Sequence, residues 1–277
     1  MRILAAKYIA DCQLKWATQE KIPLEDYTNG LKGYTKTVED NIFNKGLHLE
    51  TKKEYKNGKR AHMKALHSSS ALVVNVFDYW RHQNRIQDIA WCCGAESIIN
   101  GMEFEKIHPI KVVGRTPPHL DVEFNGAIPL AIESKFTETY HRKTRRDNED
   151  THLNIYLEHR DIWNGIPKVR ALAESIVQQS AARTDFEYID VPQLIKHILG
   201  LRCSYRGQFS LLYIWYKINS NEAKQHEQEL ARFYINIRDE ISFQIITYQD
   251  LFNKIRHLPE VNSAYLKYLE RRYFSVS

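Results

Sequence analysis

The sequence lacks an apolar run long enough to cross a bilayer, which takes about 20 consecutive apolar residues in a helix. Its N-terminus, MRILAAKYIADCQ, also lacks the marks of a signal peptide, because the short apolar stretch soon meets Asp11 and no small-residue cleavage site follows. Internal repeats and low-complexity tracts are missing as well. These absences predict a globular protein of the cytoplasm without membrane contact.

Cysteine is scarce, and the four cysteines form neither a CxxC pair nor a Cys/His spacing typical of zinc sites. Cys92 and Cys93 are neighbours in the chain, and adjacent cysteines rarely bridge one another. We therefore expect reduced thiols in a reducing compartment and no structural zinc.

The 277 residues are 43% hydrophobic and 26% charged, which is enough apolar material for a sizeable core. This length suits one large domain, or a core with an added arm. Residues 1–62 are mixed in composition and broken by glycines, which predicts a partly helical N-terminal arm. Residues 63–277 are then expected to form the core and its C-terminal helices.

The net charge is +5, and by itself this mild excess is weak evidence for a polyanionic partner. The distribution of the charges is more informative. Residues 45–64 hold seven lysines and arginines against two acids, and residues 141–146, HRKTRR, hold four before the acidic DNED. A solvated face is the plain explanation of each run.

Several segments have the pattern of helices. HSSSALVVNVFDYW is apolar nearly all round after Ser69 or Ser70, which can cap a helix, so we expect a buried helix there. A second helix is predicted around 84–100, ending at Asn100-Gly101. Later helices are predicted over 169–177, over 190–200 with Gly200 as its stop, over 221–233 and over 258–274.

Other segments alternate apolar and polar residues or form short apolar runs, which predicts strands. These segments are 103–114, 119–124, 127–136, 209–216 and 241–248. The chain thus runs through helices, a strand meander, helices, a strand, a helix, a strand and final helices. This order predicts an α/β fold with one mixed central sheet flanked by helices.

Three charged residues stand on two of these predicted strands. Asp121 alternates with apolar neighbours in HLDVEF, and Glu133 and Lys135 share one face of the following strand. Asn125-Gly126 predicts a tight hairpin between the two strands. In a two-residue hairpin Asp121 and Glu133 are not directly opposite, so a bulge or bend, for which Pro129 is a candidate, must bring them together.

Ionised side chains that are buried need an opposite charge or a metal. If Asp121 and Glu133 meet, their carboxylates form a hard oxygen site that suits Mg2+ or Mn2+, and the Ser134 carbonyl can add a third oxygen. Lys135 then points to the same place, where it can hold an attacking water or steady the charge on a phosphate. The plain alternative is a solvent-facing hairpin with a surface Glu–Lys pair worth under about 1 kcal/mol.

The stretch PHLDV…IESKFTE, within residues 118–138, resembles the PD-(D/E)XK nuclease superfamily, which has the restriction-endonuclease-like fold. Together with HSSSALVVNVF, it also resembles a bacterial branch of restriction-endonuclease-like proteins. The order of elements agrees over about residues 65–256. The resemblance implies that Asp121 and Glu133 bind the metal and that Lys135 is the catalytic lysine.

The proline of this motif is displaced. Pro117 and Pro118 lie four and three residues before Asp121, whereas the motif's proline normally precedes the aspartate directly. That proline is often missing in the superfamily, so the displacement leaves the assignment of Asp121 in place.

Weaker candidates surround the trio. Such nucleases often take one more acid from an early helix or the first strand, and here Glu96 is the helical option, while Glu103 and Glu105 are the strand options. Each is also explained as a surface acid. Gln193 resembles the glutamine that some branches place on the later helix, and its plain explanation is a polar position near a helix start. His197 is either a phosphate contact or a structural histidine.

The motif and the resemblance together predict a metal-dependent endonuclease that hydrolyses DNA phosphodiester bonds with Mg2+, or Mn2+, in bacterial restriction or defence. The mechanism is in-line attack by a metal-bound water, and the resemblance implies 5′-phosphate and 3′-hydroxyl ends. The expected partner is double-stranded DNA, with a homodimer as an option. The basic loop begins six residues after Lys135 and is expected to contact the DNA backbone. Its cations are Arg142, Lys143, Arg145 and Arg146.

Three other interpretations stay open. A non-catalytic nucleic-acid-binding protein on the same fold would have no need of Asp121, Glu133 and Lys135 together. A nuclease acting on RNA or branched DNA is not separated from a DNA nuclease by the sequence. A carboxylate-pair hydrolase acting on sugars is disfavoured by Lys135 and the basic runs, since two acids suffice for that reaction.

Overall fold

The structure is a computed structural model. It describes residues 4–25, 33–55, 59–112, 116–143, 153–178 and 186–275. Over these ranges, every helix is too short or too polar to cross a bilayer.

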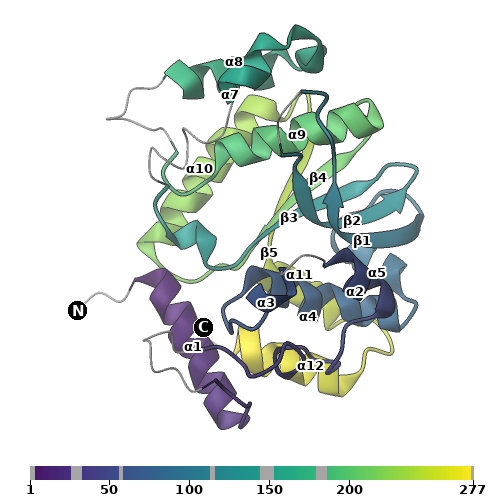
Figure 1. The fold of residues 1–277 in the computed structure, drawn as a ribbon, viewed down its shortest axis with the longest axis vertical. Coiled ribbons are helices and arrows are strands. Elements are labelled where there is room, and N and C mark those ends of the chain that lie inside the picture. Colours follow the sequence, from purple (N-terminus) through teal and green to yellow (C-terminus); the bar gives the residue numbers. More distant parts are fainter. Residues whose placement is uncertain are drawn as a thin grey trace.

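A mixed sheet of five strands lies at the centre (Figure 1), which confirms the fold class expected from the sequence. The first three strands form an antiparallel meander, and the last two run parallel to the third, so the sheet order follows the chain order. The strands are β1 (Ile99–Ile107), β2 (His119–Gly126), β3 (Leu130–Lys135), β4 (Ser210–Trp215) and β5 (Ser242–Thr247).

Helices cover both sides of this sheet (Figure 1). The group drawn above the strands contains α7 (Leu153–Glu158), α8 (Pro167–Gln178), α9 (Val191–Tyr205) and α10 (Asn221–Ile237). The group drawn below contains α1 (Ala5–Gln19), α2 (Leu49–Glu54), α3 (Lys59–His62), α4 (Ser69–His82), α5 (Ile86–Cys92), α11 (Tyr248–Ile255) and α12 (Ser263–Leu269). A π-helical turn, Glu270–Phe274, follows α12.

Helix α4 is the buried helix that the apolar run predicts. The Ser68 hydroxyl, one position earlier than expected, accepts from the amide of Ala71 and caps the first turn. Its side chains from Ala71 to Arg81 are all buried. The helix is therefore a central support of the sheet, in contact with β2 and β3.

The helix predicted over 84–100 is wrong in its second half. Helix α5 ends at Cys92, and β1 already begins at Ile99. Gly94 has a φ of +88°, a left-handed conformation that ends the helix, and a side chain there would collide with Gln244. The turn that follows carries Glu96, which is therefore not on a helix and is exposed.

The stop predicted at Gly200 is also wrong, because α9 continues to Tyr205. A Cβ atom at Gly200 would lie 2.5 Å from Pro118 Cγ and 2.8 Å from the His108 carbonyl. The glycine is needed for close packing of α9 on the segment between β1 and β2, and the helix passes through it.

The described part of residues 1–62 is tied to the C-terminal end through Arg272, which is 1% exposed. Its guanidinium donates to side-chain and backbone oxygens of Gln13 and Asn41 and to the Leu66 carbonyl. The ring of Trp16 in α1 lies against it, with 4.4 Å between the guanidinium carbon and the ring centroid. This buried cation thus joins α1, the segment after it and the end of the chain.

Candidate active site

Strands β2 and β3 bring Asp121 and Glu133 to neighbouring positions. Val122 pairs with Ile132 and Phe124 pairs with Leu130. Continuing this register by one residue places Asp121 opposite Glu133, with both side chains on the same face. From the sequence alone, we expected that Asp121 and Glu133 could meet only through a bulge or bend.

The tight turn predicted at Asn125-Gly126 is wrong, and this error explains the apparent mismatch. Both residues belong to β2, where they pair with Gly101 and Ile99 of β1. The Asn125 amide donates to Glu103 at 2.8 Å, which holds the residue in the sheet. The turn therefore comes later, and the longer connection gives the register that sets Asp121 against Glu133.

The Asp121 side chain makes a hydrogen bond to the backbone of β3. Its Oδ2 accepts from the Ser134 amide at 2.7 Å. The carbonyls of Pro129 and Lys135 accept from the amides of Ser210 and Tyr216, at the start of β4 and just after its end. Because alternate carbonyls of a strand face opposite neighbours, the Ser134 carbonyl faces the β2 side. The two carboxylates and this carbonyl thus lie at the same end of the β2–β3 pair.

The other face of the site is closed by α9. Nζ of Lys135 lies 2.6 Å from Oε1 of Glu133 and donates to Oε1 of Gln193 at 2.8 Å. One helical turn after Gln193, Nε2 of His197 lies 3.1 Å from Oε2 of Glu133. Glu133 is only 2% exposed, so both of its oxygens face nitrogen atoms in a buried setting.

These contacts shift the pKa values of the two carboxylates in opposite directions. Burial by itself raises the pKa of Glu133, but the charges of Lys135 and His197 outweigh it and bring that pKa to about 2. Burial likewise opposes the charge on Lys135, but Glu133 outweighs it and raises the pKa of the ammonium group. Burial and the charge of Glu133 raise the pKa of Asp121 well above its usual range. The surroundings therefore favour the charged form of Glu133 and oppose the charged form of Asp121.

This donor set fits a hard divalent cation. Asp121 and Glu133 supply carboxylate oxygens and the Ser134 carbonyl adds a third oxygen. A bound cation would favour the charged form of Asp121, which burial and Glu133 oppose. Across the described ranges, no three His, Cys, Asp or Glu side chains gather as a metal cage. Mg2+ commonly keeps several waters and binds through one or two carboxylates, so two are enough.

Of the proposed additional acids, the structure brings Glu105 to the site. It lies between the pairs Phe104–Val122 and Lys106–Leu120, which places it opposite Asp121, and its charge also raises the pKa of Asp121. Its φ of +54° is uncommon for a residue within a strand. Such backbone outliers gather at functional sites.

The other two acids lie elsewhere. Glu103 contacts Lys106 at 2.6 Å and accepts from Asn125, so it belongs to a structural cluster. Glu96 precedes β1, whose first residue pairs with the last residue of β2, at the opposite end from Asp121.

His197 also lies at the site, although the sequence analysis treated it only as an isolated histidine, either a phosphate contact or a structural residue. The available signal was its spacing of four from Gln193, which puts both side chains on one face of α9. Further along the same helix, the Tyr205 hydroxyl donates to Glu123, whose carboxylate also lies 2.8 Å from Nε2 of His108. Polar contacts at both ends of α9 thus lie beside its apolar packing on the sheet.

The basic loop is described only in part. Arg142 is exposed, with Nε 3.3 Å from the Glu187 carboxylate, and Nζ of Lys143 lies 3.8 Å from Asp190. Arg145, Arg146 and the DNED run lie outside the described residues. The contact of this loop with nucleic acid stays a prediction.

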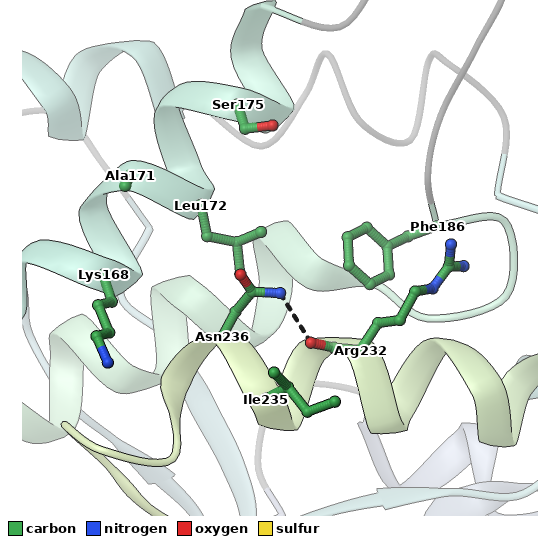
Figure 2. A pocket seen from close by; sticks show the side chains of 8 residues that line it. All are labelled: Lys168, Ala171, Leu172, Ser175, Phe186, Arg232, Ile235 and Asn236. Carbon is green, nitrogen blue, oxygen red and sulfur yellow. Dashed lines mark hydrogen bonds between the residues drawn. The ribbon is translucent and has the colours of Figure 1, made fainter.

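A cavity of about 720 Å3 lies between α8 and α10, away from the trio (Figure 2). Phe186 and Arg232 line one side, with the guanidinium carbon 5.4 Å from the ring centroid, and Asn236 donates to the Arg232 carbonyl at 2.8 Å. None of the residues predicted for the site lines this cavity.

The mixed sheet, its flanking helices and the acid–lysine site define a restriction-endonuclease-like protein. The chain belongs to the family described as restriction endonuclease associating with ARP, whose model matches residues 11–274. This membership confirms the resemblance inferred from the motif and indicates a nuclease of a defence type. No curated protein and no solved structure matches the chain.

Proposed function

We propose that the protein is a Mg2+-dependent endonuclease that hydrolyses phosphodiester bonds in double-stranded DNA, with Asp121, Glu133 and Lys135 as its catalytic residues. The proposal is supported by the hydrogen bond from the Ser134 amide to Asp121, together with the 2.6 Å contact between Glu133 and Nζ of Lys135 on either side of Ser134. Membership of a restriction-endonuclease family supports the reaction class.

Each residue has a chemical task in this proposal. The cation, when bound, supplies a Lewis acid and lowers the pKa of a water that attacks phosphorus. Asp121 and Glu133 hold it through their oxygens, and the Lys135 ammonium stabilises the negative charge that grows on the phosphate. Gln193 fixes the position of that ammonium by accepting its hydrogen bond, and His197 holds the second oxygen of Glu133.

We favour duplex DNA over RNA as the substrate, because a restriction nuclease must cut both strands of foreign DNA. We therefore propose double-stranded DNA as the partner, action in the cytoplasm, and a homodimer that presents one site to each strand. Glu105 is the proposed additional acid, since it lies across from Asp121.

The test is an incubation of the purified protein with plasmid, linear duplex, single-stranded DNA and RNA, each with Mg2+, Mn2+ or EDTA. We expect cleavage of plasmid and linear duplex with Mg2+ or Mn2+ and none with EDTA. Asp121→Ala, purified in parallel, should be inactive and so exclude a contaminating nuclease. Cleavage of RNA alone, or of nothing under any condition, would contradict the proposal.

A further inference from the structure

Glu229 lies on α10 and is 5% exposed, and it is not among the residues assigned to the candidate site. Its carboxylate accepts hydrogen bonds from three successive backbone amides, those of Glu187, Tyr188 and Ile189, at 2.9, 2.8 and 3.0 Å. These three residues belong to neither a helix nor a strand, so the carboxylate takes the place of the partners that regular secondary structure would supply. Glu229 therefore holds the segment that leads into α9.

The segment held by Glu229 is followed at once by the start of α9. Asp190, the next residue, caps this helix by accepting from the Gln193 amide at 2.9 Å. The Gln193 side chain in turn accepts from Nζ of Lys135 at 2.8 Å. A short path of hydrogen bonds and peptide bonds thus connects the Glu229 carboxylate on α10 to the Lys135 ammonium on β3.

We propose that Glu229 is a positioning residue for cleavage, which places Gln193 and through it the ammonium group of Lys135. This inference rests on the proposed nuclease, in which Lys135 stabilises the charge on the phosphate. Such a group is fully effective only where the charge develops, and a misplacement of about 1 Å can cost roughly 10²-fold in rate. A carboxylate suits this task because it accepts hydrogen bonds and donates none, so all three amides can bond to it.

The competing explanation is that Glu229 only stabilises the fold. Glu229→Gln keeps the length of the side chain and replaces one oxygen by an NH2 group, which cannot accept from an amide. Depending on the oxygen replaced, either the Glu187 amide or those of Tyr188 and Ile189 lose their acceptor. A purely structural role predicts a lower melting temperature with a wild-type cleavage rate for the folded protein, whereas a positioning role predicts slower cleavage by the folded protein.

The first measurement is single-turnover cleavage of duplex DNA with Mg2+, at a temperature where circular dichroism shows each variant to be folded. We expect Glu229→Gln to cleave about tenfold more slowly, because Lys135 is displaced. Its DNA affinity in Ca2+ should change by less than about threefold, since affinity depends on many phosphate contacts. Glu227→Gln is the matched control on the same helix, where Glu227 is 43% exposed and pairs with Lys217, and it should cleave like the wild type.

A double-mutant cycle with Gln193→Ala shows whether Glu229 acts through Gln193. When the amide side chain is already absent, Glu229→Gln should slow cleavage no further, because the path to Lys135 is broken at Gln193. Glu229→Asp, which keeps an acceptor-only group on a shorter side chain, should be slowed less than Glu229→Gln. It takes the place of Glu229→Gln in the cycle if that variant does not fold.

Backbone hydrogen exchange without nucleic acid tests the placement of Gln193 independently of cleavage. In Glu229→Gln, exchange should be faster over residues 190–194 than in Glu227→Gln, since the cap of α9 follows the segment that Glu229 holds. Unchanged exchange there, cleavage at the wild-type rate, or a slowing that multiplies with that of Gln193→Ala overturns the role of Glu229. A wild type that cleaves no nucleic acid overturns the proposed nuclease and the catalytic part of this inference, whereas faster exchange over 190–194 still supports Glu229 as the residue that places Gln193.

Discussion

At the scale of residues, the acidic side chains of the site carry more negative charge than the neighbouring cations and donors balance. Lys135 and His197 occupy the two oxygens of Glu133, at 2.6 and 3.1 Å. Asp121 accepts only one backbone amide in the described structure and has Glu105 across the ladder. This imbalance lowers the stability of the protein alone and favours a bound cation, so function and stability are opposed at Asp121.

Asp121→Asn should therefore raise the melting temperature in EDTA at pH 7. The folded-state pKa of Asp121 is raised, so the folded state binds more protons than the unfolded chain and loses stability as pH rises above the ordinary aspartate pKa of about 3.9. Each kcal/mol gained by the variant corresponds to about 2–4 °C. Thermal unfolding across pH checks this, and the difference from wild type should shrink in acid.

Asp239→Asn is the control for that measurement. Asp239 is an exposed partner of Lys168, and surface pairs contribute under about 1 kcal/mol. A lower melting temperature for Asp121→Asn than for wild type at pH 7 would show that the carboxylate stabilises the fold and would contradict the charge argument.

Lys135→Ala should reduce cleavage of duplex DNA by about 10²–10³-fold or more, because an ammonium that stabilises transition-state charge is lost. DNA affinity should change by less than about threefold, since it depends on many phosphate contacts. Single-turnover cleavage and a binding titration in Ca2+ separate the two effects. Lys106→Ala is the control, because it removes a lysine 2.8 Å from another buried glutamate, Glu123, and should still cleave.

At the scale of elements, α9 decides how the site is closed. Its first turns place Gln193 on Lys135 and His197 on Glu133, and its last turn places Tyr205 on Glu123. The helix can approach the sheet this closely because Gly200 has no side chain where the His108 carbonyl lies.

Gly200→Ala should lower the free energy of unfolding by about 1–3 kcal/mol, the usual range for overpacking. The added methyl would sit 2.8 Å from a backbone carbonyl, so α9 must shift and carry Gln193 and His197 with it. Urea unfolding and cleavage rate should both fall. Gly46→Ala, where nothing lies within 4 Å of the added carbon, is the matched control and should change neither.

At the scale of the whole molecule, a buried arginine joins segments that lie far apart in the sequence. Arg272 joins the C-terminal end to α1 and to the residues before α4. The described cations of the basic loop are by contrast not buried, and Arg142 and Lys143 lie 3.3 and 3.8 Å from the carboxylates of Glu187 and Asp190. To bind here, DNA phosphates would have to replace these carboxylates as the partners of Arg142 and Lys143.

Neutralising Arg142, Lys143, Arg145 and Arg146 together should weaken DNA binding on all sequences. The slope of log affinity against log salt should flatten by up to about four units if each cation contacts a phosphate. Binding titrations at several salt concentrations measure this. Glu187→Gln is a useful companion, because freeing Arg142 should strengthen binding, and an unchanged slope in the quadruple variant would move the DNA path to residues 45–64.

The sequence by itself determined the features that depend on local periodicity. Alternation placed Glu133 and Lys135 on one face of a strand, and the apolar run after Ser68 specified the buried helix α4. The order of helices and strands was enough to predict the mixed sheet, and the motif within residues 118–138 carried the resemblance to its family. These features follow from neighbours a few residues apart, whose geometry is set by the helix and strand repeats.

Only the tertiary structure decided which residues meet at the site. The register of β2 and β3 set Asp121 against Glu133, because Asn125 was held in the sheet by Glu103 rather than in a tight turn. Lys135 and Gln193, whose side chains meet at the site, are 58 residues apart in the sequence. Such contacts depend on how strands pair and helices pack across the whole chain, and no local pattern in the sequence encodes that packing.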